Sequence, residues 1–112
     1  MNLHELREYL EEAKQYAQDS QDEMYIIITK RASEALESGI KILDALNSLG
    51  ECPNVEDDFY GWDGWWSSYN RLVNQRTRSD GILSVCLEVM GFEYNEVQNV
   101  IKQATYTYRK RM

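Results

Sequence analysis

Leucines and alanines recur in steps of three and four residues in the first segment, and this spacing restricts the fold more than any other feature. Positions at such steps share one face of an α-helix, and the repeat is typical of a helix that packs lengthwise on another helix. Asn2 and Glu5 have the spacing of a capping box, which marks a helix start. The spacing therefore predicts an amphipathic helix next to Asn2, with the buried stripe Leu3, Leu6, Leu10, Ala13 and Ala17.

Small residues dominate a second apolar stripe, which continues to about residue 48. Ser20 and Glu23 have the spacing of a second capping box, while Gly50 and Pro53 indicate the end of the helix. Because small side chains let a neighbouring helix approach closely, we expect this stripe to be a packing face. The sequence leaves open whether 2–48 is one bent helix or two. The stripe consists of Ile28, Ala32, Ala35, Gly39, Ile42 and Leu46.

Helical spacing resumes at Trp65, and the stretch "TRSDG" at 77–81 predicts a break before a further helix. Gly91 is expected to end that helix in the left-handed conformation, followed by an apolar contact from Phe92. A last helix is expected from Asn95, with Val97, Val100, Ile101, Ala104 and Tyr108 on its buried face. We therefore predict an all-α protein, a single compact bundle of four to five helices that comprises residues 1–112 as one domain.

The connection between the second and third helices, about 50–64, is predicted to be a long acidic aromatic loop. It holds the sole proline and three of the six glycines, and loops of this length in small domains are often functional. Neighbouring helical positions diverge by about 100°, so Trp65 and Trp66 cannot both face the core. We expect Trp65 to be buried and Trp62 to be exposed.

The same stretch supplies the candidate binding surface. An exposed indole rimmed by carboxylates suits a cationic protein surface, because the aromatic group anchors the partner and the acids steer it. The residues are Glu56, Asp57, Asp58, Phe59, Tyr60, Trp62, Asp63 and Trp66.

Charge is distributed unevenly along the chain. The net charge is −7, residues 1–68 carry 15 acids against 5 bases, and residues 69–112 carry 4 acids against 7 bases. The acidic part disfavours direct binding of nucleic acid or an anionic membrane, although the basic end "YRKRM" could reach a phosphate. No apolar run approaches the roughly 18 residues of a membrane span, and the acidic N-terminus is unlike a signal peptide. We expect a cytoplasmic protein in which Cys52 and Cys86 are reduced thiols.

Residues for catalysis or metal binding are sparse. His4 is the only histidine and the two cysteines have no metal-ligand spacing, so we predict no metal site, no cofactor and no enzymatic activity. Two E-x-x-E pairs, Glu8 with Glu11 and Glu34 with Glu37, resemble acid pairs of all-α magnesium-dependent nucleotide pyrophosphatases. Helical geometry places Glu8 on the far side from the first apolar stripe, and Glu34 and Glu37 flank the second stripe and point outward, which disfavours this alternative.

The expected function is that of a small, acidic, non-catalytic binding protein. Its partner would be a basic protein surface, such as that of a nuclease or another nucleic-acid enzyme, as for inhibitors carried by phages and mobile elements. In the DNA-mimic version, acids on the first two helices stand in for phosphates. The alternatives are an immunity or antitoxin protein, and a self-associating structural or regulatory protein whose homodimer forms through Ala32–Gly39.

Overall fold

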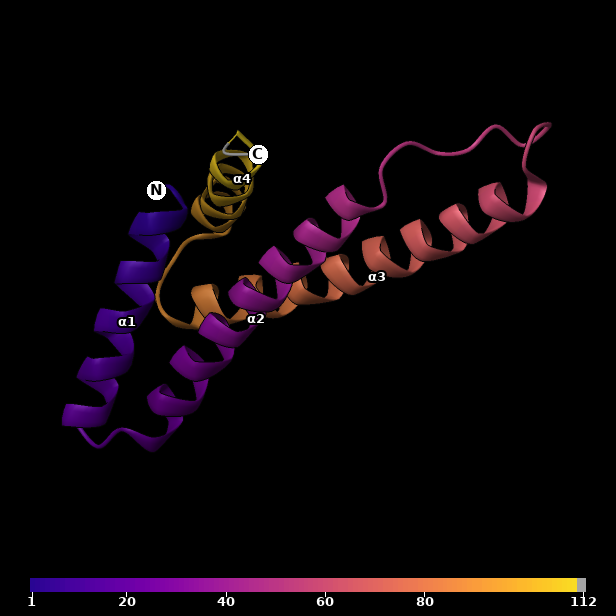
Figure 1. Ribbon diagram of the computed structural model, residues 1–112. Coiled ribbons are helices and arrows are strands. Elements are labelled where there is room, and N and C mark those ends of the chain that lie inside the picture. Colours follow the sequence, from indigo (N-terminus) through magenta and orange to yellow (C-terminus); the bar gives the residue numbers. More distant parts are fainter. Residues whose placement is uncertain (111–112) are drawn as a thin grey trace.

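Four helices make up the described part of the chain. The computed structural model describes residues 1–110 and the side chains of residues 1–104. Within that range there is no strand, so the predicted all-α class is confirmed, and no described helix is long and apolar enough to cross a membrane. The helices are α1 Leu3–Asp19, α2 Glu23–Ser48, α3 Phe59–Val89 and α4 Tyr94–Lys110 (Figure 1).

Capping residues explain where α1 begins and ends. The Asn2 side chain accepts a hydrogen bond from the Glu5 amide at 2.9 Å, and the Glu5 carboxylate accepts one from the Asn2 amide at 3.5 Å, which confirms the predicted capping box. After α1, Gln21 adopts a left-handed conformation with φ 56°. Its amide donates to the carbonyl of Gln18, and the Asp22 amide donates to that of Ala17. This turn separates 2–48 into two helices.

Asp22, not Ser20, is the N-cap of α2. The Asp22 side chain accepts a hydrogen bond from the Tyr25 amide at 3.1 Å. The predicted Ser20–Glu23 capping box is therefore wrong, because the turn at Gln21 moves the helix start two residues along the chain. Ser20 instead closes α1, donating its amide to the Tyr16 carbonyl.

The antiparallel pair α2 and α3 is the longest structure in the molecule, and α3 extends beyond α2. A Cβ placed on Gly39 of α2 would lie 3.9 Å from the Asp80 carboxylate of α3, which sets the register. Both helices rise 1.5 Å per residue, so Ser48 is level with about residue 71 of α3. The segment 59–70, roughly 18 Å of helix, therefore projects past the end of α2, as Figure 1 shows.

The core lies where all four helices meet, away from this projection. Leu6, Leu10 and Leu87 are fully buried there, together with Val97 of α4. Phe92 packs edge-on against Tyr9 with ring centroids 5.2 Å apart, which provides the apolar contact expected after Gly91. The predicted stripes are confirmed in part, because Ala13, Ile42 and Leu46 are only half-buried. The stripe residues that lie in the buried core are Leu3, Leu6, Leu10, Ala32, Ala35, Val97, Val100 and Ala104, and the stripes did not include Leu36 and Leu87, which are also buried there.

The junction of α3 and α4 has the conformation predicted from Gly91 and Phe92. Gly91 has φ 105°, its amide donates to the Glu88 carbonyl, and the Phe92 amide donates to the Leu87 carbonyl. These two bonds form a Schellman motif, which requires a residue that tolerates positive φ. The last helix begins at Tyr94, one residue before the predicted Asn95, and the Tyr108 side chain lies outside the described residues.

Two expectations about the middle of the chain are wrong. The irregular connection ends at Asp58, so Phe59, Tyr60, Trp62 and Asp63 belong to α3 and not to a loop over 50–64. The predicted break at 77–81 is absent, because packing of Leu83, Cys86 and Leu87 outweighs the low helix propensity of this stretch.

The bundle is elongated, not compact as expected. Its extents are 60 × 25 × 22 Å and its radius of gyration is 16.9 Å, against about 13 Å for a compact domain of this length. The uncovered end of α3 accounts for this shape.

Candidate protein-interaction surface

The candidate residues all lie at the projecting end of the molecule, which we call the tip and define as residues 50–70. Asn54 organises its connection, because its side chain accepts from the Glu56 amide at 2.9 Å and its carbonyl accepts from the Asp58 amide at 2.9 Å. The Asp58 carboxylate then accepts from the Gly61 amide at 3.0 Å and caps α3. One tight turn therefore fixes the acids directly before the first aromatic residues of α3.

Acidic and aromatic side chains are exposed together at the tip. Glu56, Asp57 and Asp63 are exposed, as are Tyr60, 86% exposed, and Phe59, 55% exposed. Asp58 is also exposed, but as the N-cap of α3 it has a structural role in addition to its charge. The candidate acids are therefore accessible to a partner without any change in the fold.

Aromatic rings contact one another in two groups along the projecting part of α3. Phe59 lies near both Tyr60 and Trp62, with ring centroids 5.7 and 6.0 Å apart. Further along, Trp65 and Tyr69 stack with centroids 5.1 Å apart and planes within 9°. Trp66 meets both of these rings edge-on. These contacts hold large apolar side chains in place on a helix that has no helical neighbour here.

The tryptophans differ from expectation in their burial. Trp65 is half-buried, not a core residue, and its indole N–H donates to the Gly50 carbonyl at 3.2 Å. Trp62 is also half-buried, whereas Trp66 is 40% exposed. The reason is that the tip lies beyond the end of α2, where Trp65 contacts the connection through the Gly50 carbonyl.

A groove runs from the tip toward α4. It is open to solvent, has a volume of about 1320 Å³ and is lined by α3, the end of α2 and α4. Trp65, Tyr69 and Val73 form part of its wall, and Arg76 and Lys102 lie toward its inner end. Spacing alone gave no sign of this groove, because it depends on where α4 docks.

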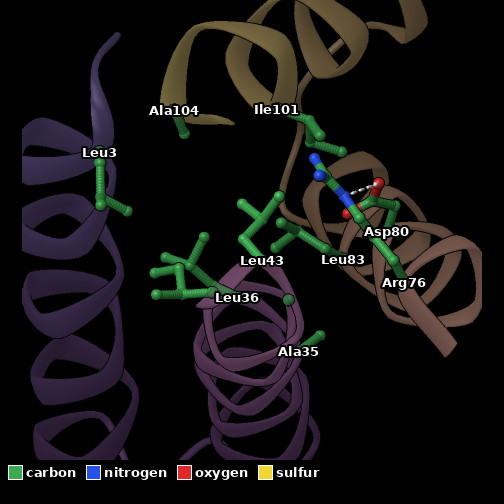
Figure 2. Close-up of a pocket in the computed structure, with 11 residues that line it drawn as sticks. Leu3, Ala35, Leu36, Leu43, Arg76, Asp80, Leu83, Ile101 and Ala104 are labelled. Atoms are coloured by element: carbon green, nitrogen blue, oxygen red, sulfur yellow. Dashed lines mark ion pairs between the residues drawn. The ribbon is translucent and has the colours of Figure 1, made fainter. Parts of the chain in front are cut away.

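Next to the groove is a small cavity of about 20 Å³ in which an ion pair lies against apolar side chains (Figure 2). The Arg76 guanidinium lies 3.5 Å from the Asp80 carboxylate, beside Leu43, Leu83 and Ile101. Burial raises the pKa of Asp80 above its usual range, and the positive charge of Arg76 offsets part of that rise.

The acid pairs on α1 and α2 do not converge. Glu37 forms a two-point ion pair with Arg7, at 2.7 and 2.9 Å, and Glu8 lies 3.0 Å from His4. Glu34 and Glu11 are exposed. Among the described residues, no group of three His, Cys, Asp or Glu side chains could hold a metal ion.

Cys86 and the stripe Ala32–Gly39, which the sequence also singled out, lie in the core and not at the tip. The Cys86 thiol is buried, and that burial raises its pKa, although Arg31 partly offsets the effect. The stripe Ala32–Gly39 faces the core and α3, so it is not accessible to a second chain as the dimer alternative required. The basic end of the chain, residues 108–112, lies outside the described side chains.

Comparison with known proteins adds no relative. A scan against protein-family models, a search of curated proteins and a search of solved structures each return no match.

Proposed function

We propose that this chain is a small acidic binding protein that docks on a basic protein surface through its tip. The observation that carries the proposal is the joint exposure of Glu56, Asp57, Tyr60 and Asp63 at an end of the molecule that no other helix covers. Aromatic anchors supply contact area at low entropic cost, and surrounding acids raise the rate of encounter with a cationic surface. The partner class is a nuclease or another nucleic-acid enzyme, whose substrate groove is positively charged.

Docking through the tip is favoured over the DNA-mimic version of the same function. That version uses the acids of α1 and α2 as phosphate substitutes, but Glu37 is already paired with Arg7, and Glu8 contacts His4. An acid that holds a cation within its own chain attracts an external cation less strongly. Glu11, Glu12 and Glu34 stay exposed on α1 and α2, so the tip is favoured mainly because its acids lie beside the exposed aromatic side chains Phe59 and Tyr60.

Affinity capture from the native host with three baits tests the proposal. We expect the wild-type chain to retain a protein with a basic surface, and the variant Glu56→Lys/Asp57→Lys to lose it, because the charge that steers the partner is reversed. The matched control is Glu11→Lys/Glu12→Lys, which makes the same charge change at exposed positions of α1.

The three baits also separate the alternatives. Retention by the control with loss by the tip variant supports docking at the tip. Loss by the control alone would move the contact surface to α1 and support the DNA-mimic version. Capture of a toxin that the chain neutralises would assign it to the immunity or antitoxin class.

A further inference from the structure

A seam of mostly apolar side chains, interrupted by the Arg76–Asp80 ion pair, runs along α3, and only half of it is covered. Residues recur in steps of three and four from the tip into the core, which places them on one face of the helix. The last two members, Leu83 and Leu87, are buried against other helices, whereas Trp62, Tyr69 and Val73 are half-buried and Trp66 is exposed. The seam consists of Trp62, Trp66, Tyr69, Val73, Arg76, Asp80, Leu83 and Leu87.

The uncovered half of the seam borders the groove. Tyr69, Val73, Arg76 and Asp80 all line it. The groove is open to solvent and has a volume of about 1320 Å³, so a helix of a second chain can approach Tyr69 and Val73 from outside.

Opposite charges lie at the two ends of this face. Asp63 is exposed beside the seam at the tip, whereas Lys102 is exposed and borders the groove at its inner end, where Arg76 is paired with Asp80. A face that is negative at one end and positive at the other is complementary to itself when a second copy is turned by a two-fold rotation. This charge pattern favours a second copy of the chain as the occupant of the groove.

We propose that the chain forms a homodimer in which the two α3 helices pack antiparallel along Trp62–Asp80, each seated in the groove of the other copy. In this register the tip of each copy lies against the inner end of the groove of the other copy, and Tyr69 lies opposite Val73 of the second copy. It also sets Trp66 next to the Arg76–Asp80 ion pair of the second copy. On the same flank, Asp63 of each copy faces Lys102 of the other.

The proposal goes beyond the docking function and shares some residues with it. Trp62, Asp63 and Trp66 would be covered in the dimer, whereas Tyr60 lies about 160° around the helix from the seam residue Trp62 and stays accessible. A cationic partner that needs Asp63 would therefore compete with the second copy. The mass of the isolated chain tests the dimer without any partner, so failure of one proposal is distinguishable from failure of the other.

Sedimentation equilibrium over a concentration series, with charge swaps, is the test. We expect the wild-type chain to approach twice 13.2 kDa as concentration rises. Lys102→Glu and Asp63→Lys should each weaken dimerisation about tenfold, because each swap places like charges together at both ends of the interface. The double variant Asp63→Lys/Lys102→Glu should restore it. Lys41→Glu, an exposed lysine of α2 outside the groove, is the matched control and should behave as wild type.

Either of two results would overturn the proposal. One is a mass of 13.2 kDa at every concentration. The other is a dimer that tolerates both single swaps yet dissociates in Val85→Asp, which would place the interface on the outer face of α3, where Ile82, Val85 and Val89 are exposed. Because Asp63 and Lys102 are exposed, the swaps leave the fold intact, and far-UV circular dichroism checks this.

Discussion

Two residues reduce the stability of the fold, Gln21 through its backbone conformation and Asp80 through its partly buried charge. Gln21 has φ 56° in the turn between α1 and α2, a region in which a side chain costs roughly 1–2 kcal/mol relative to glycine. Asp80 keeps a carboxylate beside the apolar Leu43 and Leu83. Each cost arises at a single residue, so replacing that residue measures it.

Gln21→Gly is expected to stabilise the protein by about 1 kcal/mol, because glycine adopts positive φ without a steric penalty. The free energy of unfolding from urea denaturation measures the effect. Gln18→Gly is the matched control, since Gln18 is exposed within α1, where glycine should destabilise by roughly 0.5–1 kcal/mol. Equal destabilisation by both substitutions would show that the turn at Gln21 is not left-handed.

Asp80 should make stability fall as pH rises. Burial, partly offset by Arg76, raises the pKa of the folded-state carboxyl above the unfolded value of about 3.8, so the folded state holds the proton more tightly. This contribution is fully present below the unfolded pKa and is lost as pH passes through the raised folded pKa. Asp80→Asn should therefore gain stability relative to wild type over that pH window. Urea denaturation at a series of pH values measures the difference, and a difference that stays constant or shrinks with pH would contradict the raised pKa.

At the level of elements, α3 determines the architecture, because its 31 residues extend past every neighbouring helix. Three glycines lie within it, and each alone lowers helix propensity by up to about 1 kcal/mol relative to alanine. Gly61 has a specific reason to be glycine, since a Cβ there would collide with the capping carboxylate of Asp58. Gly64 has open space around its Cβ position.

Gly61→Ala and Gly64→Ala should consequently have opposite effects. Gly64→Ala is expected to stabilise α3 by about 0.5–1 kcal/mol through propensity alone. Gly61→Ala should cancel that gain or destabilise by about 1 kcal/mol, because the displaced Asp58 no longer caps the helix. Thermal denaturation of both variants measures this contrast. If the two substitutions stabilise equally, α3 does not begin at an Asp58 cap.

Local sequence patterns predicted helix ends correctly where adjacent residues determine them. They failed where contacts between distant residues determine the structure. Asn2 with Glu5 and Gly91 with Phe92 gave correct helix ends, because capping depends on a few adjacent residues. The predicted break at 77–81 followed local propensity, whereas α3 continues through this stretch because Leu83, Cys86 and Leu87 pack into the core. Spacing predicted that Trp65 is buried, whereas it is half-buried, because its position beyond α2 and its hydrogen bond to the distant Gly50 carbonyl are tertiary features.

The whole molecule is a bundle with one helix end extended from it. Its four-helix core occupies one part of the 60 Å long axis, and the tip occupies the other end. The core anchors α3 through Leu83 and Leu87, so side chains at the tip can change without loss of the fold. This separation of stability from surface chemistry is what a docking protein requires.

Substitution by alanine should have a large effect on stability in the core and a small effect at the tip. Leu87→Ala is expected to cost about 2–5 kcal/mol of unfolding free energy, because Leu87 is fully buried in the core. Phe59→Ala, at a 55% exposed position, should change stability by no more than about 0.5 kcal/mol. Denaturant titrations compare the two, and a large loss in Phe59→Ala would mean that the tip is part of the core.

Calorimetric titration of the captured partner with Tyr60→Ala tests docking at the tip most directly. Tyr60 is 86% exposed, and Tyr16 of α1, 67% exposed, provides the matched control Tyr16→Ala. We predict that Tyr60→Ala keeps wild-type stability and loses at least about 2 kcal/mol of binding free energy, about a thirtyfold rise in Kd, while Tyr16→Ala binds as wild type. Equal affinities for Tyr60→Ala and wild type would contradict docking through the tip.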